Sequence, residues 1–281
     1  MRKLKIFMTL WMIFLAAKIS YAAPYLQQKT TDSKTKKAIK DPRPVTPTGL
    51  GFSLGVWVNP NFSGITQTGG GTLISLNHNL GFANQTLFIP KIWYRWRHGQ
   101  ILDLSYAEIQ QTVAQKLNAP ETFQGLSFPE GEPETSNMDI KWADLTYEYP
   151  IYYDTYPPVN RYLNVVLDMK YLQGAFNMTN SSGETSAHPP IYVVFPLIGL
   201  HGKFKIAKRT TAEFKTEGIM AGFEDAVGYS YDLQAGLTYR FAKQVGLSAK
   251  YRNFDFYNRD ASDNIFSFRL YGPEINLVVD F

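Results

Sequence analysis

The sequence contains no cysteine. This absence excludes a disulfide framework, a lipoprotein anchor and any metal site built on thiolates. It is consistent with an oxidising compartment, where an unpaired thiol is a liability. An H-E-x-x-H sequence is also lacking, and Gly69-Gly70-Gly71 is not followed by the Lys-Ser/Thr of a phosphate-binding loop. The sequence predicts neither a metal site nor a cofactor.

Long hydrophobic runs are absent after residue 22, and the one near the start is short. Arg2, Lys3 and Lys5 precede an apolar stretch of 12 residues, from Ile6 to Ala17. A membrane-spanning helix needs about 20 apolar residues. Small residues at a signal-peptidase site follow, in Ser20-Tyr21-Ala22. We therefore predict that residues 1–22 are a cleaved secretory signal, with a short N-terminal anchor as the alternative.

Most of the chain also lacks an excess of basic charge. The sequence has 28 basic and 24 acidic residues, but residues 1–48 hold ten of the basic and two of the acidic ones. Residues 49–281 therefore carry 18 basic and 22 acidic residues. Because the basicity lies outside this part, the charge gives no support for nucleic acid as a partner.

The segment 23–48 is polar, basic and contains several prolines. It has too little apolar content to form a packed core, so we predict a disordered periplasmic tail. The predicted folded part is then residues 49–281.

Alternating apolar and polar residues recur in ten segments of this part, separated by clusters of Gly, Pro, Asn and Asp. The segments are 51–63, 86–97, 100–113, 137–149, 161–176, 191–206, 210–222, 228–241, 244–257 and 265–281. We predict an all-β fold with a single transmembrane antiparallel β-barrel of about ten strands, eight being the second choice. A soluble β-sandwich or lipocalin-like barrel is the alternative, because the pattern alone does not separate inside from outside.

The connections predict the direction of the strands. If the first strand runs outward, the periplasmic turns 98–99, 207–209 and 242–243 are tight, and 150–160 is the exception. The extracellular loops 64–85, 114–136 and 177–190 are long, whereas 223–227 and 258–264 are shorter. Short periplasmic turns with longer extracellular loops are typical of outer-membrane barrels.

The last predicted strand also supports a location in the outer membrane. Ile275, Leu277, Val279 and Phe281 alternate with the residues between them up to the last position. A terminal aromatic residue on the apolar face is similar to the C-terminal signature that the barrel-assembly machinery recognises. We expect Phe281 to be this assembly signal, and we expect outer-membrane lipid and lipopolysaccharide around the barrel.

The alternation also predicts the lining of the lumen. Lipid has to receive the apolar face, because a charge at the bilayer midplane costs about 2–4 kcal/mol. The predicted lining carries the acids Asp103, Asp144, Glu148, Asp168, Glu213, Glu217, Asp232, Glu274 and Asp280, and the bases Lys91, Arg95, Lys170, Lys203, Lys205, Lys215, Arg240, Lys250 and Arg252. Opposed charges in a narrow lumen should pair. We predict a largely plugged lumen held by ion pairs.

The four histidines offer little for catalysis. His78 and His188 fall in predicted outer loops and His98 in a turn, whereas His201 is on an inward position near the periplasmic end. The ten-stranded omptin proteases have a similar size, but their Asp–His dipeptide does not occur here. His201 beside interior carboxylates is a weak candidate for a general base.

Five segments appear in an order that resembles a family of Gram-negative barrels, the GlyGly-type outer-membrane proteins. They are GVWVNPNFSG (55–64), ISLNHNLGF (74–82), FQGLSFPEGEPETSNMDIKWADLTYEY (123–149), LDMKYLQGAF (167–176) and YGPEINLVVDF (271–281). The resemblance covers about residues 50–281 and departs from the family at the long basic tail. It implies a barrel with an LGF first loop and a GP bend in the last strand, and no assigned activity.

Three functions follow from these observations. The first is a non-enzymatic barrel that is structural or interacts through its loops, with loop 114–136 the main exposed surface. The second is a transporter of small or hydrophobic solutes, entered between loops 64–85 and 114–136. The third is an outer-membrane hydrolase, a protease or a lipid A-modifying enzyme, that uses His201. The sequence identifies no small-molecule ligand.

Overall fold

The computed structural model describes residues 48–69, 71–154, 161–223 and 226–281. The predicted signal, residues 1–22, and the predicted tail up to residue 47 lie outside the described residues. Within the described part, no helix is long and apolar enough to cross a membrane.

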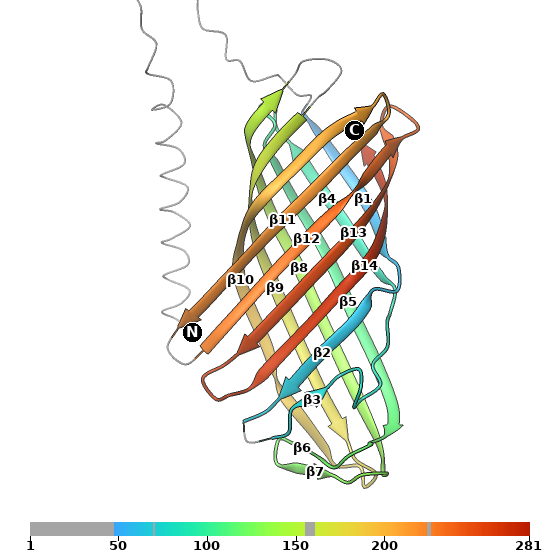
Figure 1. Ribbon diagram of the computed structural model, residues 1–281, viewed down its shortest axis with the longest axis vertical. Coiled ribbons are helices and arrows are strands. Elements are labelled where there is room, and N and C mark those ends of the chain that lie inside the picture. Colours follow the sequence, from blue (N-terminus) through green and yellow to red (C-terminus); the bar gives the residue numbers. More distant parts are fainter. Residues whose placement is uncertain (1–47, 70, 155–160, 224–225) are drawn as a thin grey trace, which may run out of the picture. The chain divides into compact units, whose positions relative to one another are not determined.

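The described residues form a closed antiparallel β-barrel (Figure 1). Its wall consists of β1 Gly49–Trp57, β4 Leu87–Arg95, β5 Ile101–Lys116, β8 Pro133–Asp154, β9 Arg161–Thr179, β10 Thr185–Ala207, β11 Thr210–Phe223, β12 Ala226–Arg240, β13 Val245–Arg259 and β14 Ile265–Asp280. Four further strands complete the fold: β2 Asn61–Gln67, β3 Ile74–Ser75, β6 Glu121–Phe123 and β7 Leu126–Phe128. The prediction of a ten-stranded barrel is confirmed.

The first predicted strand is interrupted but keeps its neighbour. β1 pairs with β14 from Gly51 opposite Asp280 to Trp57 opposite Glu274, and β2 continues along β14 from Asn61 opposite Tyr271. Between them, Asn59 has a positive φ of 38°. β1 and β2 therefore count as one position in the wall, and the β1–β14 ladder closes the barrel.

The two ends of the barrel differ in their connections. The end that holds the C-terminus has tight turns, such as the one in which Gly99, with a φ of 83°, donates its backbone N–H to Trp96 O. The opposite end carries β6 and β7 (Figure 1). We call this opposite end the extension.

Several predicted loops are wrong, because strands run through them. β9 and β10 continue to Thr179 and from Thr185, so most of the predicted loop 177–190 is strand, and His188 lies in β10. The predicted loop 114–136 holds the end of β5, the β6–β7 hairpin and the start of β8. Its polar residues alternate with buried ones, so a polar composition there marks a water-facing strand surface rather than a loop.

Strand β14 shows how side-chain polarity changes along the wall. Near the C-terminus, Ile275 and Leu277 point outward and are exposed, and Glu274 is buried inside. Beyond Gly272 and Pro273 the pattern is exchanged: the aromatic and aliphatic side chains point inward and the polar ones point outward. The inward residues there are Phe266, Phe268 and Leu270, and the outward ones are Ser267, Arg269 and Tyr271.

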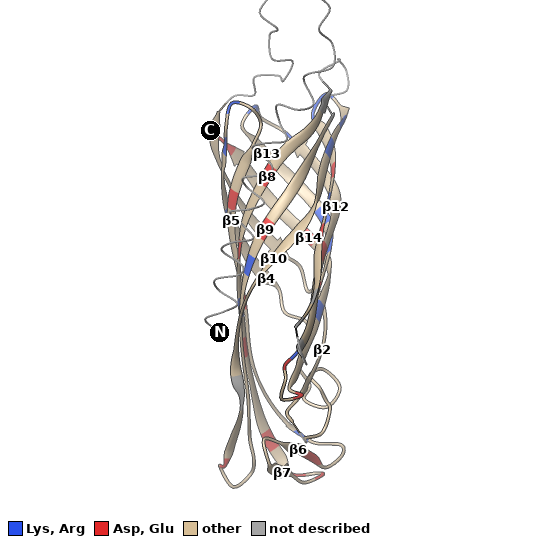
Figure 2. Cartoon of the chain, turned by 90° about the vertical axis from the view of Figure 1, so that its left-hand side faces the viewer, with Lys and Arg blue, Asp and Glu red and all other residues tan. Residues whose placement is uncertain are grey.

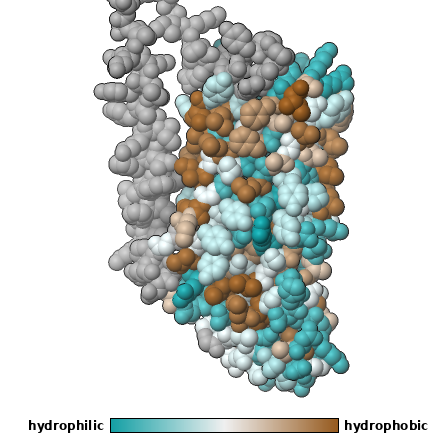
Figure 3. Space-filling view, in the orientation of Figure 1, coloured by the Kyte–Doolittle hydropathy of each residue, from teal (hydrophilic) through white to brown (hydrophobic). Residues whose placement is uncertain are grey.

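Strand β8 has the same exchange. Leu145 points outward, and Asp144 and Glu148 are buried inside. From Trp142 back towards the start of the strand, the inward residues are apolar and the outward ones are polar. The buried residues there are Met138, Ile140 and Trp142, and the outward ones are Asn137, Asp139 and Lys141. Figure 3 shows hydrophilic side chains gathered at the end of the barrel that carries β6 and β7. The outer surface is therefore apolar on the half of the barrel that holds the C-terminus, which we call the C-terminal half, and polar on the extension.

The apolar surface has the height of a lipid-facing belt. On β12, the outward residues between Tyr231 and Tyr239 are Leu233, Ala235 and Leu237. Eight residues at a rise of ~3.4 Å and a tilt of ~40° span roughly 20 Å, close to the ~25 Å apolar band of outer-membrane barrels. Tyrosines at both edges match the aromatic girdles of such a band.

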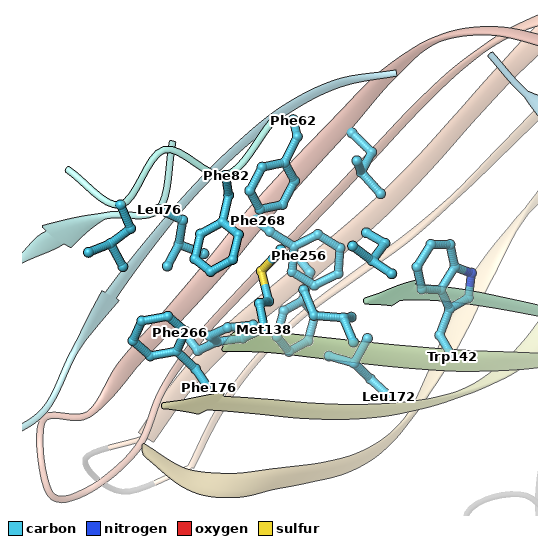
Figure 4. Packing of buried hydrophobic residues seen from close by; sticks show 14 of the residues in the cluster. Phe62, Leu76, Phe82, Met138, Trp142, Leu172, Phe176, Phe256, Phe266 and Phe268 are labelled. Atoms are coloured by element: carbon cyan, nitrogen blue, oxygen red, sulfur yellow. The ribbon is translucent and has the colours of Figure 1, made fainter. Parts of the chain in front are cut away.

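The structure places charged side chains inside the barrel at the level of the belt and apolar side chains inside the extension. There, buried residues from β2, β8, β9, β13 and β14 form a hydrophobic core, as Figure 4 shows for Phe62, Met138, Phe176 and Phe268. Trp142 and Phe254 stack with ring centroids 5.8 Å apart. Where the outer surface faces water instead of lipid, burying the apolar face inside is the favourable choice.

We predict that an outward arginine is costly only inside the belt. Ile275→Arg places a charge against lipid and should lower the free energy of unfolding by about 2–4 kcal/mol. The control, Ser267→Arg, lies outward on the same strand beyond the exchange and should change it by less than about 0.5 kcal/mol. Equilibrium unfolding in urea with lipid vesicles measures both. Equal losses in the two variants would contradict the assignment of the belt.

Candidate functional site in the barrel interior

The C-terminal half of the barrel encloses a polar chamber of about 160 Å³. Figure 2 shows acidic and basic residues interspersed along its strands. The lining brings together many residues of the predicted lumen: Lys91, Arg95, Asp103, Asp144, Glu148, Lys203, Glu213, Lys215, Glu217, Arg240, Lys250, Arg252, Glu274 and Asp280. The alternation of each strand places them inward, since neighbouring residues point outward to the belt.

Opposed charges in the chamber form pairs. Lys91 lies 2.9 Å from Asp103, and Lys215 lies 2.8 Å from Glu217. Glu213 is shared by Lys203 at 3.4 Å and Lys250 at 2.8 Å. Arg240 contacts Asp280 near the C-terminus. Such pairs satisfy charges that would be costly to bury alone.

Lys170 and Arg252 lie at the boundary between the chamber and the hydrophobic core. Lys170 is fully buried, pairs with Asp144 and lies 3.6 Å from Asp168. Its ammonium also lies 5.1 Å from the centre of the Phe254 ring.

Arg252, which also lies at the boundary, makes the same kinds of contact as Lys170. It pairs with Asp232, lies 3.6 Å from Glu274 and sits 5.0 Å from the centre of the Trp57 ring. Both cations therefore have carboxylates and an aromatic ring face close by, and cation–π attraction adds to the ion pairs.

His201 meets a carboxylate, as a general base would. Its Nδ1 lies 2.8 Å from Glu148 Oε2, and the amide of Asn164 donates to the same oxygen at 2.7 Å. The Tyr162 ring packs edge-on against the imidazole with centroids 5.9 Å apart.

A catalytic role for His201 needs a nucleophile or a bound water as well. Across the described ranges, the hydrogen bonds of the His201 side chain go to Glu148, and no Ser or Thr hydroxyl contacts its imidazole. His78 and His98 are exposed and lie in turns. The described residues also contain no group of three or more His, Asp or Glu side chains that could hold a metal ion. The arrangement at His201 is that of a member of a polar network.

The extension is closed by the first loop and the β6–β7 hairpin. Leu80 and Phe82 of the LGF sequence are buried in the core, and Gly81 between them has a φ of 70°. Phe123 and Phe128 of the hairpin are buried as well, with Phe123 packed edge-on against Phe176 at 5.1 Å. Both segments are therefore anchored in the core by apolar side chains, while most of the residues around the hairpin, such as Glu130, are exposed.

The first loop replaces a missing ladder beside the outer part of β5. The pairing of β4 with β5 ends at Lys91 and Ser105. Beyond it, the Gln111 side chain accepts from Ala83 N at 3.0 Å and donates to Ala83 O at 2.8 Å. Side-chain amides thus hold the loop against the strand where backbone pairing has stopped.

Two carboxyls in the extension were not predicted as site residues. Glu121 accepts from Asn79 Nδ2 at 2.8 Å, and Glu134 accepts from Ser136 Oγ at 2.9 Å. Both side chains are buried, and burial raises the pKa of both above the usual carboxyl value. The nearby charge of Glu121 raises the pKa of Glu134 further.

We predict that losing Arg252 is costly but that losing its pair is tolerated. Arg252→Gln leaves Asp232 and Glu274 without their cation and should lower the free energy of unfolding by about 3–5 kcal/mol. Arg252→Gln combined with Asp232→Asn should recover at least half of that loss. Urea unfolding of the refolded barrel measures both, and a double variant no more stable than the single one would contradict the role of the pair.

We predict that the extension is more stable at acid pH. Because the pKa of each carboxyl is raised in the folded state, the protonated form is favoured there; this stability is present below the usual pKa of about 4.5 and is lost as the pH rises through the raised value. Glu134→Gln should slow proteolysis of the segment 117–131 at pH 7.5 and leave it unchanged at pH 4. The exposed Glu130→Gln is the control. Equal cleavage of Glu134→Gln and the unchanged protein at pH 7.5 would refute the prediction.

No protein-family model matches the chain, and no curated protein matches it in sequence. Solved structures do match. The outer membrane protease OmpT from Escherichia coli has a TM-score of 0.55 at 8% identity over 84% of this chain and 98% of that one. The attachment invasion locus protein Ail of Yersinia pestis has a TM-score of 0.34 at 12% identity, covering 82% and 99% of the two chains.

The toluene transporter TodX of Pseudomonas putida has a TM-score of 0.32 at 9% identity, covering 84% and 90% of the two chains. Of these three structures, OmpT has a TM-score above 0.5, and at 8% identity this likeness concerns the fold alone. The chain has the fold of an outer-membrane β-barrel.

Proposed function

We propose that this protein is a non-enzymatic integral barrel of the bacterial outer membrane, with a closed lumen, that acts structurally or through the surface of its extension. The closed interior is the observation that carries the proposal. A solute passing along the axis would have to break the ion pairs around Lys170 and Arg252 and then displace the core around Trp142 and Phe268. Breaking buried ion pairs and opening a packed core are both costly.

The direction of the chain supports an extracellular location for the extension. Tight turns lie at the C-terminal end and the β6–β7 hairpin at the other, as in barrels with periplasmic termini. The exposed side chain of Phe281 fits an assembly signal that is read by the barrel-assembly machinery. After cleavage of the predicted signal, the predicted tail would be periplasmic, and lipopolysaccharide would surround the extension.

The two alternatives have less support. A hydrolase would use the His201–Glu148 pair, but this pair lies inside a chamber of about 160 Å³, too small for a peptide or a lipid A headgroup. A transporter would need a route through the core of the extension, where Phe123, Phe176 and Phe254 are almost completely buried. A static barrel fits the geometry better than either.

We predict that the protein does not conduct ions. Reconstituted in a planar lipid bilayer, it should give no steady conductance above the bare membrane at applied voltages of about 100 mV, because neither half of the interior is open. A wide porin inserted in the same membrane is the positive control, and protease protection of the extension checks insertion. A large, steady conductance of the inserted protein would overturn the proposal.

A further inference from the structure

The outer surface of β5, β8 and β9 carries two rows of mainly polar side chains on the extension, and the row Glu108, Lys141 and Gln173 separates them from the tyrosines and leucines of the apolar belt. The register places Gln110, Asp139 and Ala175 side by side, and next to them Thr112, Asn137 and Asn177. We call these six residues the amide patch. All six point outward, since Ile109, Met138 and Phe176 between them are buried in the core.

Hydrogen bonds hold the amide patch in one arrangement. Thr112 Oγ1 donates to Asn137 Oδ1 at 2.6 Å, and Asn137 Nδ2 donates to Asn177 Oδ1 at 2.9 Å. Amides ordered in this way lose less conformational entropy when they bind a ligand. The patch lines a groove of about 270 Å³, and the short side chain of Ala175 lies within it.

The groove offers hydrogen-bonding groups of both kinds. Asp139 Oδ2 is paired with Lys141 at 2.8 Å, and Asp139 Oδ1 is buried, so a ligand does not reach it. The exposed side chain of Gln110 offers its amide oxygen as an acceptor instead. Among the described residues, no hydrogen bond uses the side-chain nitrogens of Gln110 or Asn177. An acceptor beside two amide donors matches the hydroxyls of a sugar, each of which donates and accepts.

The charges around the groove argue against an anionic ligand. Lys141, the cation beside it, is shared between Asp139 at 2.8 Å and Glu108 at 3.2 Å. One ammonium between two carboxylates leaves a net negative charge, which repels phosphate. An uncharged polyhydroxylated group fits the patch.

The surface below the amide patch is suited to lipid. Towards the C-terminal end, the next row across the three strands holds Glu108, Lys141 and Gln173. The two rows after it hold Tyr106 and Tyr171, then Leu104 and Leu145. The two leucines are exposed, and the Tyr106 and Tyr171 hydroxyls bond to Glu108 and Gln173 on the side of the patch. Tyrosines in this position mark the level of lipid headgroups. A molecule with its acyl chains on the leucines would place its headgroup at the groove.

We propose that the amide patch binds the uncharged sugar headgroup of a glycolipid whose acyl chains lie against Leu104 and Leu145. The inference rests on the proposed function only in taking the extension to be at the outer leaflet. The acyl chains hold the headgroup close to the patch, so the two contacts act together and raise its effective concentration.

Native mass spectrometry of the detergent-solubilised protein tests this proposal. The probes are glucosyl-diacylglycerol, phosphatidylglycerol with the same acyl chains, and maltotriose. Glucosyl-diacylglycerol should give at least a tenfold higher fraction of bound protein than either of the others. Gln110→Ala combined with Asn177→Ala should reduce that binding at least fivefold. Ala175→Leu, which fills the groove and keeps every amide, should do the same.

The control is Ser267→Ala, an outward polar position on β14 away from the patch, which should bind like the unchanged protein. The urea midpoint of each variant confirms that it is folded. Equal binding of the two lipids would mean that only the apolar belt holds them and would overturn the proposal. Binding of maltotriose as strong as that of the glycolipid would also overturn it, in favour of a site for soluble glycans. Neither result depends on whether the barrel conducts.

Discussion

The alternation of side chains along a closed strand ties the inside of this barrel to what surrounds it. Successive residues point to opposite faces, so a strand that turns apolar residues outward must turn its polar ones inward. On β14, Ile275 and Leu277 face outward while Glu274 lies inside; after Pro273, Arg269 faces outward while Phe268 lies inside. The same exchange on β8 makes it a property of the wall. The interior is thus charged within the belt and hydrophobic beyond it.

The two kinds of interior meet at Lys170 and Arg252. A charged layer next to a hydrophobic core raises a problem of desolvation, because a cation at the boundary loses water on the apolar side. Here the ring faces of Phe254 and Trp57, together with the paired carboxylates, surround the two cations. Each cation thereby has both a carboxylate and a ring face as favourable partners. The contacts of Lys170 and Arg252 at this boundary therefore support a closed lumen.

The extension gives the proposed function its surface. Its hydrophobic core lets the strands continue beyond the belt as a rigid wall, held at the first loop by the Gln111 side chain where the β4–β5 ladder has ended. Outward residues on this wall do not contribute to the core, so they are free to recognise other molecules. The amide patch on β5, β8 and β9 is one such region; hydrogen bonds join Thr112, Asn137 and Asn177, and one row of side chains separates the patch from the tyrosines at the lipid level.

The sequence was sufficient for the barrel and for the identity of its charged lining. Period-two alternation, turn residues and the terminal strand predicted ten strands. The same alternation predicted inward positions such as Asp144, Lys170 and Arg252. It was less informative about strand ends. Residues 177–190 are polar whether they form a loop or a water-facing strand, and β10 in fact begins at Thr185. Glu121 and Glu134 carried no signal, since a carboxyl in a polar segment is normally exposed.

The sequence by itself determined which residues share a face of each strand, because that depends only on the pleat of the backbone. Only the tertiary structure decided which face is inside at each height. Phe268 and Leu277 are both apolar, yet one is buried in the core and the other is exposed on the belt. The choice depends on whether lipid or water surrounds that level of the wall. It also depends on whether neighbouring strands supply enough apolar side chains to fill the space inside. Both are properties of the closed barrel and not of any single strand.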